Sequence, residues 1–395
     1  MNLDRSPFRV LLIFLRLGLT SFGGPIAHIG YFRAEFVTRR KWLGESEFAD
    51  LVALCQFLPG PASSQVGFAL GVSRAGLLGG LAAWTGFTLP SAVLLFAFAQ
   101  VAASLKSAAA LAAIHGLKIV AVAVVAQAVW GMARTLAPDG RRAAIALFAA
   151  LVALFAAGSL AQIAAILVGA VAGYFFCRQT LATQTGQLSF PIGRRFGVAM
   201  LGIFGALLIA LPLLASTNHA LAVFDAFYRS GALVFGGGHV VLPLLHDAVV
   251  SKGWVSQDVF LAGYGAAQAV PGPLFTFAAF LGSALNTPPD NLAGAALALV
   301  AIFLPGLLIL LGALPFWDEF RKRMGAQAMM RGVNAAVVGI LGAALYNPLW
   351  TTAILAPRDF ALALAGFLAL TMWKAPPWTV VAGTVIAAIA LSSIG

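Results

Sequence analysis

The sequence predicts an all-α polytopic membrane protein with two inverted-topology repeats, each containing broken or re-entrant helical hairpins. Three observations predict this class. The 395 residues are 61% hydrophobic and only 9% charged, whereas water-soluble domains carry about 25% charged residues. Apolar runs long enough to cross a bilayer recur along the whole length. Several phrases that break helices occur twice, in the same order.

The clearest repeated phrase is Gln-x-x-Pro-Gly-Pro, which occurs at 56–61 and again at 268–273. A glycine run precedes each copy, at 22–24 and at 235–238. Matched positions stay about 212 to 216 residues apart, which two unrelated apolar stretches would not maintain. We therefore expect a first repeat with a basic linker at 1–195, an unpaired span at 196–215 and a second, inverted repeat at 216–395.

The first repeat begins with two apolar segments that are broken near their middles. Residues 8–32 are interrupted at Gly23-Gly24-Pro25, and residues 46–73 at Pro59-Gly60-Pro61. Proline lacks the N–H that a helix needs and glycine weakens a helix, so a break is expected at each place. The remainder predicts spanning helices at 76–103, with a kink at Pro90, and at 109–133, two short helices over 143–177 that meet near Gly158-Ser159, and a polar linker at 178–195.

The second repeat follows the same order after an unpaired span at 196–214. We expect broken segments at 221–245 and 256–286, spanning helices at 291–315 and 330–347, and a closing helical pair at 359–373 and 377–394.

Two topologies fit these segments. If each broken segment returns to its own side, the chain makes about nine crossings with four re-entrant hairpins; if each crosses once, it makes about thirteen. Re-entrant hairpins place the basic loop 33–41 inside, together with Arg74, the loop at 134–142 and Lys374. The positive-inside rule therefore favours them, with the N-terminus cytoplasmic and the C-terminus outside.

Composition excludes several classes of function. The net charge of +11 reflects cytoplasmic loops rather than a nucleic-acid surface. The sequence contains no Walker A phrase, no Gly-x-Ser-x-Gly elbow and no Cys/His cluster with metal spacing, so we expect neither an enzyme nor a cofactor or metal. Cys55 and Cys177 lie in apolar surroundings and suggest no disulfide.

Inverted repeats with paired broken helices are typical of secondary transporters, whose substrate site lies near the membrane midplane. A broken helix exposes unpaired N–H groups and its positive dipole end, and both attract an anion. The glycines at 23–24 and 236–238 would let the backbone approach a ligand closely. The alternative is that these glycines only permit close helix packing.

Two arginines lie inside apolar sequence, six or seven residues before the glycine runs. Arg16 and Arg229 would each cost at least about 2.5–3.5 kcal/mol to insert, so a cavity or a partner is expected. A guanidinium suits a tetrahedral oxyanion. The alternatives are snorkelling to an interface, or pairing with a carboxylate such as Asp50, Glu47 or Asp225.

A weaker polar set accompanies the breaks. Gln56 and Gln268 could donate to an oxyanion or cap exposed carbonyls. His239 could couple protons, or it could be a hydrogen-bonded structural histidine. His115, Lys118, Arg331 and Asn334 could line the route or sit at the interface.

At these residues the sequence resembles the chromate ion transporter family in its long two-domain form. The resemblance covers nearly the whole chain and rests on Ser21-Phe22-Gly23-Gly24-Pro25, Phe235-Gly236-Gly237-Gly238-His239-Val240-Val241-Leu242-Pro243 and both Gln-x-x-Pro-Gly-Pro phrases. It implies a bacterial inner-membrane protein that exports chromate, driven by the membrane potential or a proton gradient, and confers chromate resistance. Sulfate is a similar tetrahedral dianion, so a sulfate or other oxyanion carrier stays open.

The expected partners are therefore a chromate- or sulfate-like oxyanion and the lipid bilayer, with no nucleic acid; a homodimer is left open. A passive anion channel would use the same charges, and a structural or sensory membrane protein or a membrane enzyme would leave the matched arginines unexplained. The residues expected to bind substrate are Arg16, Ser21, Gly23, Gly24, Gln56, Gly60, Arg229, Gly236, Gly237, Gly238, His239, Gln268 and Gly272.

Overall fold

The computed structural model describes residues 6–102, 107–156, 159–178, 190–320 and 323–393, and every regular element in these ranges is helical. Within them, five helical stretches are long and apolar enough to cross a membrane: Ala62–Ala102, Ala108–Leu136, Arg194–Leu214, Asn291–Phe320 and Met324–Ala353. The predicted all-α polytopic class is confirmed. The predicted junction at Gly158 and most of the linker, residues 179–189, lie outside the described ranges.

The first broken segment folds back on itself. Helix α1 (Pro7–Thr20) ends before Ser21, and α2 (Gly24–Phe32) continues as a π-helical stretch, Arg33–Arg39. The Phe14 ring lies 5.0 Å from the Phe36 ring and 5.7 Å from the Phe32 ring, which requires the chain to reverse between them. With 14 residues, α1 is about 21 Å long, too short to cross a hydrocarbon core of about 30 Å.

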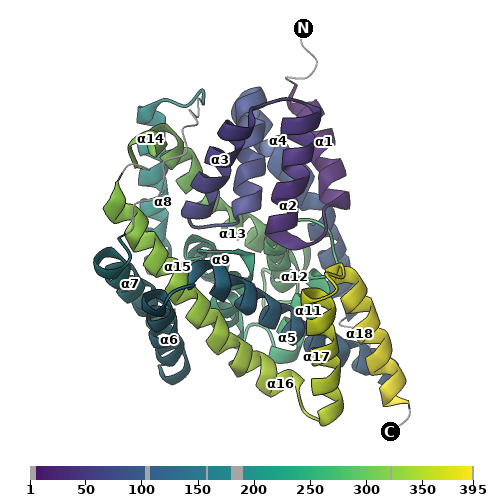
Figure 1. Cartoon of the computed structure of the whole chain (residues 1–395). Coiled ribbons are helices and arrows are strands. Elements are labelled where there is room, and N and C mark those ends of the chain that lie inside the picture. The colour runs from purple at the N-terminus through teal and green to yellow at the C-terminus, as the bar shows by residue number, and fades with distance from the viewer. Residues whose placement is uncertain (1–5, 103–106, 157–158, 179–189, 321–322, 394–395) are drawn as a thin grey trace.

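The second broken segment consists of α3 (Glu45–Phe57), the break at 58–61 and the first arm of α4 (Ala62–Ala102). Helix α4 changes direction at Ala75 and Gly76, whose backbone angles are not helical, while at Pro90, where a kink was predicted, the helix continues. Its two arms lie close together, because a Cβ on Gly71 would overlap the carbonyl of Gly79. Figure 1 shows α1 to α4 side by side at the N-terminal end of the molecule.

Helices α5 (Ala108–Leu136), α6 (Gly140–Phe155), α7 (Ser159–Phe176) and α8 (Arg194–Leu214) follow, close to the predicted bounds. Both α6 and α7 pack against α15 (Figure 1). Small residues allow this approach: a Cβ on Gly332 of α15 would overlap the carbonyl of Gly169, and one on Gly339 would overlap that of Ala146.

The same order of elements returns after α8. A broken segment is formed by α9 (His219–Ala232) and the helical stretch 238–250, which includes α10 (Val241–Leu245); a second is formed by α11 (Gln257–Ala267) and α12 (Phe277–Ser283). The remaining elements are α13 (Asn291–Ala313), α14 (Trp317–Phe320), α15 (Met324–Ala344), α16 (Thr351–Ala353), α17 (Pro357–Thr371) and α18 (Pro377–Ser392). This order suits the predicted division at 195 and 215, and the inverted orientation of the halves stays a prediction.

Candidate functional site

The breaks of one half bond to the breaks of the other through the main chain. The Gly60 N–H donates to the Val234 carbonyl at 2.7 Å, and the Gly272 N–H donates to the Ser21 carbonyl at 2.9 Å. In the repeat, Gly60 matches Gly272 and Ser21 matches Val234, so one hydrogen bond occurs twice. Each bond satisfies polar groups that a broken helix leaves unpaired in an apolar interior.

Glycine is required at both Pro-Gly-Pro breaks. Gly60 and Gly272 have φ angles of +117° and +95°, in the left-handed region that side chains disfavour. A Cβ on Gly60 would lie 3.0 Å from Gly306 Cα, and a Cβ on Gly272 would lie 2.8 Å from Ser91 Oγ. Close packing of the two halves, rather than ligand approach, therefore explains Gly60, which is buried.

Gln65 holds the first break closed and was missed in the sequence. Its buried side chain donates from Nε2 to the carbonyls of Pro59 and Gly306, both at 2.9 Å. The predicted glutamine, Gln56, is exposed at the end of α3. Comparison of the repeats did not indicate Gln65, because Phe277 occupies the matching position in the second half. The signal in the sequence was a single glutamine in the otherwise apolar stretch after the first Pro-Gly-Pro break.

We predict that Gln65→Leu lowers the stability of the purified protein by about 2–3 kcal/mol, because the buried Gly306 carbonyl and the half-buried Pro59 carbonyl lose their donor. The measurement is the midpoint of thermal unfolding in detergent, with Gln56→Leu as the matched control. An unfolding midpoint that falls equally in both variants would contradict the role assigned to Gln65.

A cavity of about 500 Å³ opens where three of the breaks meet. The first glycine run borders it with Phe22, Gly23 and Gly24, the second Pro-Gly-Pro break with Gln268 and Gly272, and the third break with His239. Helix α2 begins at Gly24, so its first N–H groups have no partner within the helix and open toward the break. Residues from both halves thus line one cavity, among them Gly23, Gly24, His239, Gln268 and Gly272, and substrate binding by these five stays a prediction.

The turn between α17 and α18 supplies a cation to this cavity. Lys374 lies in that turn and is the charged side chain among the described lining residues. Its helices have only 15 and 16 residues, or about 22–24 Å, so the turn can lie within the bilayer. Figure 1 shows the turn beside the middle of the molecule, whereas α18 ends at the C-terminus far from it. From the sequence, Lys374 was expected only as a basic loop residue on the cytoplasmic side.

Hydrogen bonds fix the polar side chains around the cavity. His239 Nδ1 lies 2.7 Å from the Tyr264 hydroxyl, and Gln268 Nε2 donates to the Tyr264 carbonyl at 3.3 Å. On the other side, His28 is buried between the Ser63 hydroxyl and the Ser21 carbonyl. His239 therefore has a structural partner, and its part in proton coupling stays a prediction.

The first two glycines of the second run, Gly236 and Gly237, pack against helix α5 rather than bordering the cavity, whereas Gly238 lies beside the lining residues Pro25 and Leu274, and substrate binding by Gly238 stays a prediction. A Cβ on Gly236 would lie 3.1 Å from a methyl of Leu136 and 3.4 Å from Asn334 Oδ1. Gly237 lies beside Met132 of the same helix, α5, as Leu136. These two glycines thus serve close packing, the alternative that the sequence left open.

The convergence expected of Arg16 and Arg229 is wrong: neither side chain lines the cavity. Arg16 is exposed, away from the buried face of α1 that carries Phe14 and Leu17. Arg229 forms an ion pair with the buried carboxylate of Asp225, one turn earlier on α9. Arg16 lies four residues before the end of α1 and Arg229 three residues before the end of α9, or about 5–6 Å along each helix.

The predicted route residues also have other surroundings. His115 Nε2 lies 3.0 Å from the Asp359 carboxylate, and the Lys118 ammonium lies 2.8 Å from that of Asp258. Arg331 donates to the Cys177 carbonyl at 2.8 Å. Asn334 packs against Gly236, as described above. None of these four borders the central cavity in the part of the chain that the structure describes.

Comparisons with known proteins agree over most of the chain. A family model described as "Chromate transporter" matches residues 8–174 and 221–390. The chain is 28% identical over 373 residues to a chromate transport protein of Pseudomonas aeruginosa, covering 91% of this chain and 86% of that protein. It is 25% identical over 342 residues to a chromate transport protein of Cupriavidus metallidurans, covering 85% and 81%. No solved structure matches.

Proposed function

The chain belongs to the chromate transporter family, and from this premise we propose that it moves chromate, or a similar tetrahedral oxyanion, through the cavity between its two halves. The family, together with the long apolar helices, makes it a multi-pass membrane transporter. One observation carries the assignment of the site: a cation, Lys374, and the open start of α2 border the same cavity, between breaks from both halves.

Each of these groups suits an anion. The ammonium of Lys374 attracts negative charge, and N–H groups at a helix start donate to it. Gln268 adds a side-chain amide that can donate a hydrogen bond. Gly23 and Gly24, with φ angles of +98° and +75°, have no Cβ that would keep a ligand from the backbone N–H groups. One positive charge and three or four hydrogen-bond donors are enough to bind the oxygens of a tetrahedral dianion.

Export is the favoured direction. An inside-negative potential drives a dianion outward, with about 2.3 kcal/mol per charge for each 100 mV. Basic loops on the cytoplasmic side would also enrich anions near the entrance. On this proposal, the N-terminus is cytoplasmic, the C-terminus is outside, and export lowers the cytoplasmic chromate concentration enough to confer resistance.

We expect purified protein in proteoliposomes to accumulate chromate when the imposed potential favours uptake, with saturable kinetics and competition by sulfate. Molybdate and phosphate serve as further competitors, and protein-free liposomes as the control. With the membrane potential clamped at zero, chromate-loaded vesicles should also show counterflow, which a passive channel cannot produce. Absence of chromate flux under every imposed gradient would refute the proposed function.

A further inference from the structure

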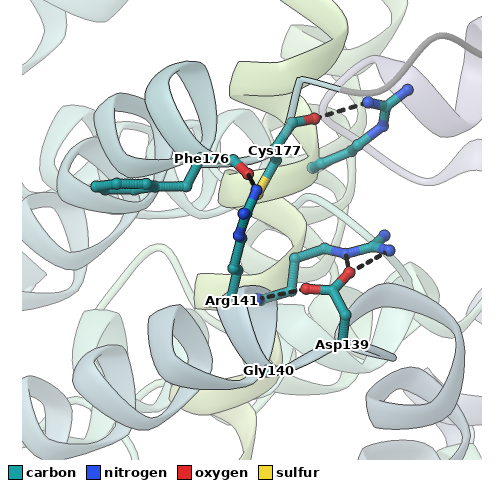
Figure 2. A pocket seen from close by; sticks show the side chains of 7 residues that line it. Asp139, Gly140, Arg141, Phe176 and Cys177 are labelled. Atoms are coloured by element: carbon teal, nitrogen blue, oxygen red, sulfur yellow. Dashed lines mark hydrogen bonds and ion pairs between the residues drawn. The ribbon is translucent and has the colours of Figure 1, made fainter.

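A second cavity, of about 400 Å³, lies where α6 begins and α7 ends, and none of its lining residues belongs to a broken helix. Three arginines from two helices border it, with one acidic residue and the last residues of α7 (Figure 2). Transport through the central cavity uses none of them. The lining residues are Asp139, Gly140, Arg141, Arg142, Phe176, Cys177 and Arg331.

Two of the arginines are held in place by carbonyls that end α7. Arg141 Nη1 donates to the Phe176 carbonyl at 3.2 Å, and Arg331 Nη1 donates to the Cys177 carbonyl at 2.8 Å. Figure 2 shows Arg141 reaching from the start of α6 to the end of α7. Arg331 Nη2 also donates to Gln327 Oε1 at 3.3 Å. A guanidinium has five N–H donors, so these bonds fix the positions of both positive charges at the cavity.

The cavity keeps an excess of positive charge. Asp139 is its acidic residue; it accepts from the Arg142 N–H at 3.0 Å and from the Arg142 guanidinium at 2.6 Å. These bonds, with the backbone bond the largest cause, hold the pKa of Asp139 below its ordinary value, so this carboxylate is ionised near neutral pH. Three arginines against one aspartate leave two net positive charges.

An apolar surface adjoins these charges. Phe176 borders the cavity and is 59% exposed, and its chain neighbour Phe175 is 66% exposed. Arg178 lies over the Tyr174 ring, 4.3 Å from its centroid. Exposed aromatic rings beside arginines at helix ends are typical of the boundary between headgroups and hydrocarbon. A ligand that fits both parts is anionic at one end and apolar along its length.

We propose that this cavity binds the phosphate of an anionic phospholipid through Arg141, Arg142 and Arg331, with the acyl chains along the exposed faces of α6 and α7. Basic pockets between membrane helices bind phosphate headgroups in this manner. A guanidinium group can donate two parallel hydrogen bonds to two phosphate oxygens. In a zwitterionic lipid, the headgroup's own cation weakens this attraction, so an anionic lipid is preferred. The lipid would tie the α6–α7 hairpin to α15.

The test is native mass spectrometry of the full chain, released from nanodiscs that contain equal parts of phosphatidylglycerol and phosphatidylcholine. We expect one phosphatidylglycerol to remain bound to the natural protein. Retention should fall at least tenfold in Arg141→Gln/Arg331→Gln and be unchanged in Arg195→Gln, which removes an exposed arginine that does not border the cavity.

Two outcomes would overturn the proposal. Equal retention of phosphatidylglycerol and phosphatidylcholine by the natural protein would show that the headgroup charge is not recognised. This comparison uses the natural protein alone, so it does not depend on the folding of a variant. Complete displacement of phosphatidylglycerol by millimolar inorganic phosphate would assign the cavity to free phosphate instead. Size-exclusion profiles in phosphatidylcholine verify that the double variant is folded. Because the readout is lipid binding, neither outcome bears on chromate flux.

Discussion

Replacing Lys374 by alanine is expected to slow chromate transport about 10- to 100-fold. The variant removes the positive charge from the described lining of the central cavity, and a hydrogen bond to a charged group contributes about 1.5–3 kcal/mol. The measurement is the initial rate of chromate uptake into inverted membrane vesicles, across a range of chromate concentrations. We expect the loss mainly as weaker apparent affinity, because the cation attracts substrate before any conformational step.

Two controls make this result specific. Lys374→Arg keeps the charge and should keep most of the transport, whereas Arg358→Ala removes an exposed charge from the other end of α17 and should change little. Protein amounts in the vesicles are matched by immunoblot. If Lys374→Ala transports chromate within twofold of the natural rate, Lys374 does not bind the substrate, and the assignment of this cavity as the transport site is contradicted.

Gly272→Ala is expected to destabilise the protein by about 2–5 kcal/mol and to abolish transport at growth temperature. The left-handed backbone alone costs an alanine about 1–2 kcal/mol, and overpacking against Ser91 Oγ and the Phe87 carbonyl adds about 1–3 kcal/mol. The strain would also weaken the bond from the Gly272 N–H to Ser21. Thermal unfolding in detergent and vesicle transport measure the two effects.

The source of the strain can be separated by a second substitution. Ser91→Gly removes the nearest side-chain atom, so the pair Gly272→Ala/Ser91→Gly should recover the overpacking part but not the backbone part. Gly131→Ala is the matched control, because a Cβ there meets nothing within 4 Å. Full stability of Gly272→Ala would contradict the close packing at this break.

The broken helices could be predicted because their cause is local. Glycine and proline act on the backbone where they stand, so Gly23-Gly24, Pro59-Gly60-Pro61 and Pro271-Gly272-Pro273 marked the breaks correctly, and their recurrence indicated two halves. The turn at Ala75-Gly76 falls at the boundary between the predicted segments 46–73 and 76–103, where Arg74 interrupts the apolar sequence.

The side chains at the site were harder to predict because burial and direction depend on tertiary packing. Arg229 stands four residues after Asp225, a spacing that pairs charges on one helix face, so its partner was available in the sequence. Arg16 required knowledge of which face of α1 is buried. Lys374 was overlooked because loop charges are ordinarily solvated; the shortness of α17 and α18 was the signal that this turn could lie deeper.

The two matched main-chain bonds, from Gly60 to Val234 and from Gly272 to Ser21, have a mechanical consequence. Polar groups in an apolar interior resist separation, because each unpaired group costs several kcal/mol there. A rotation about the line through both bonds stretches them least, so that line is the natural pivot when one half tilts against the other. The α17–α18 turn borders the cavity beside Gly272 and would move little, whereas the C-terminal end of α18 lies far from this line and would travel much further (Figure 1).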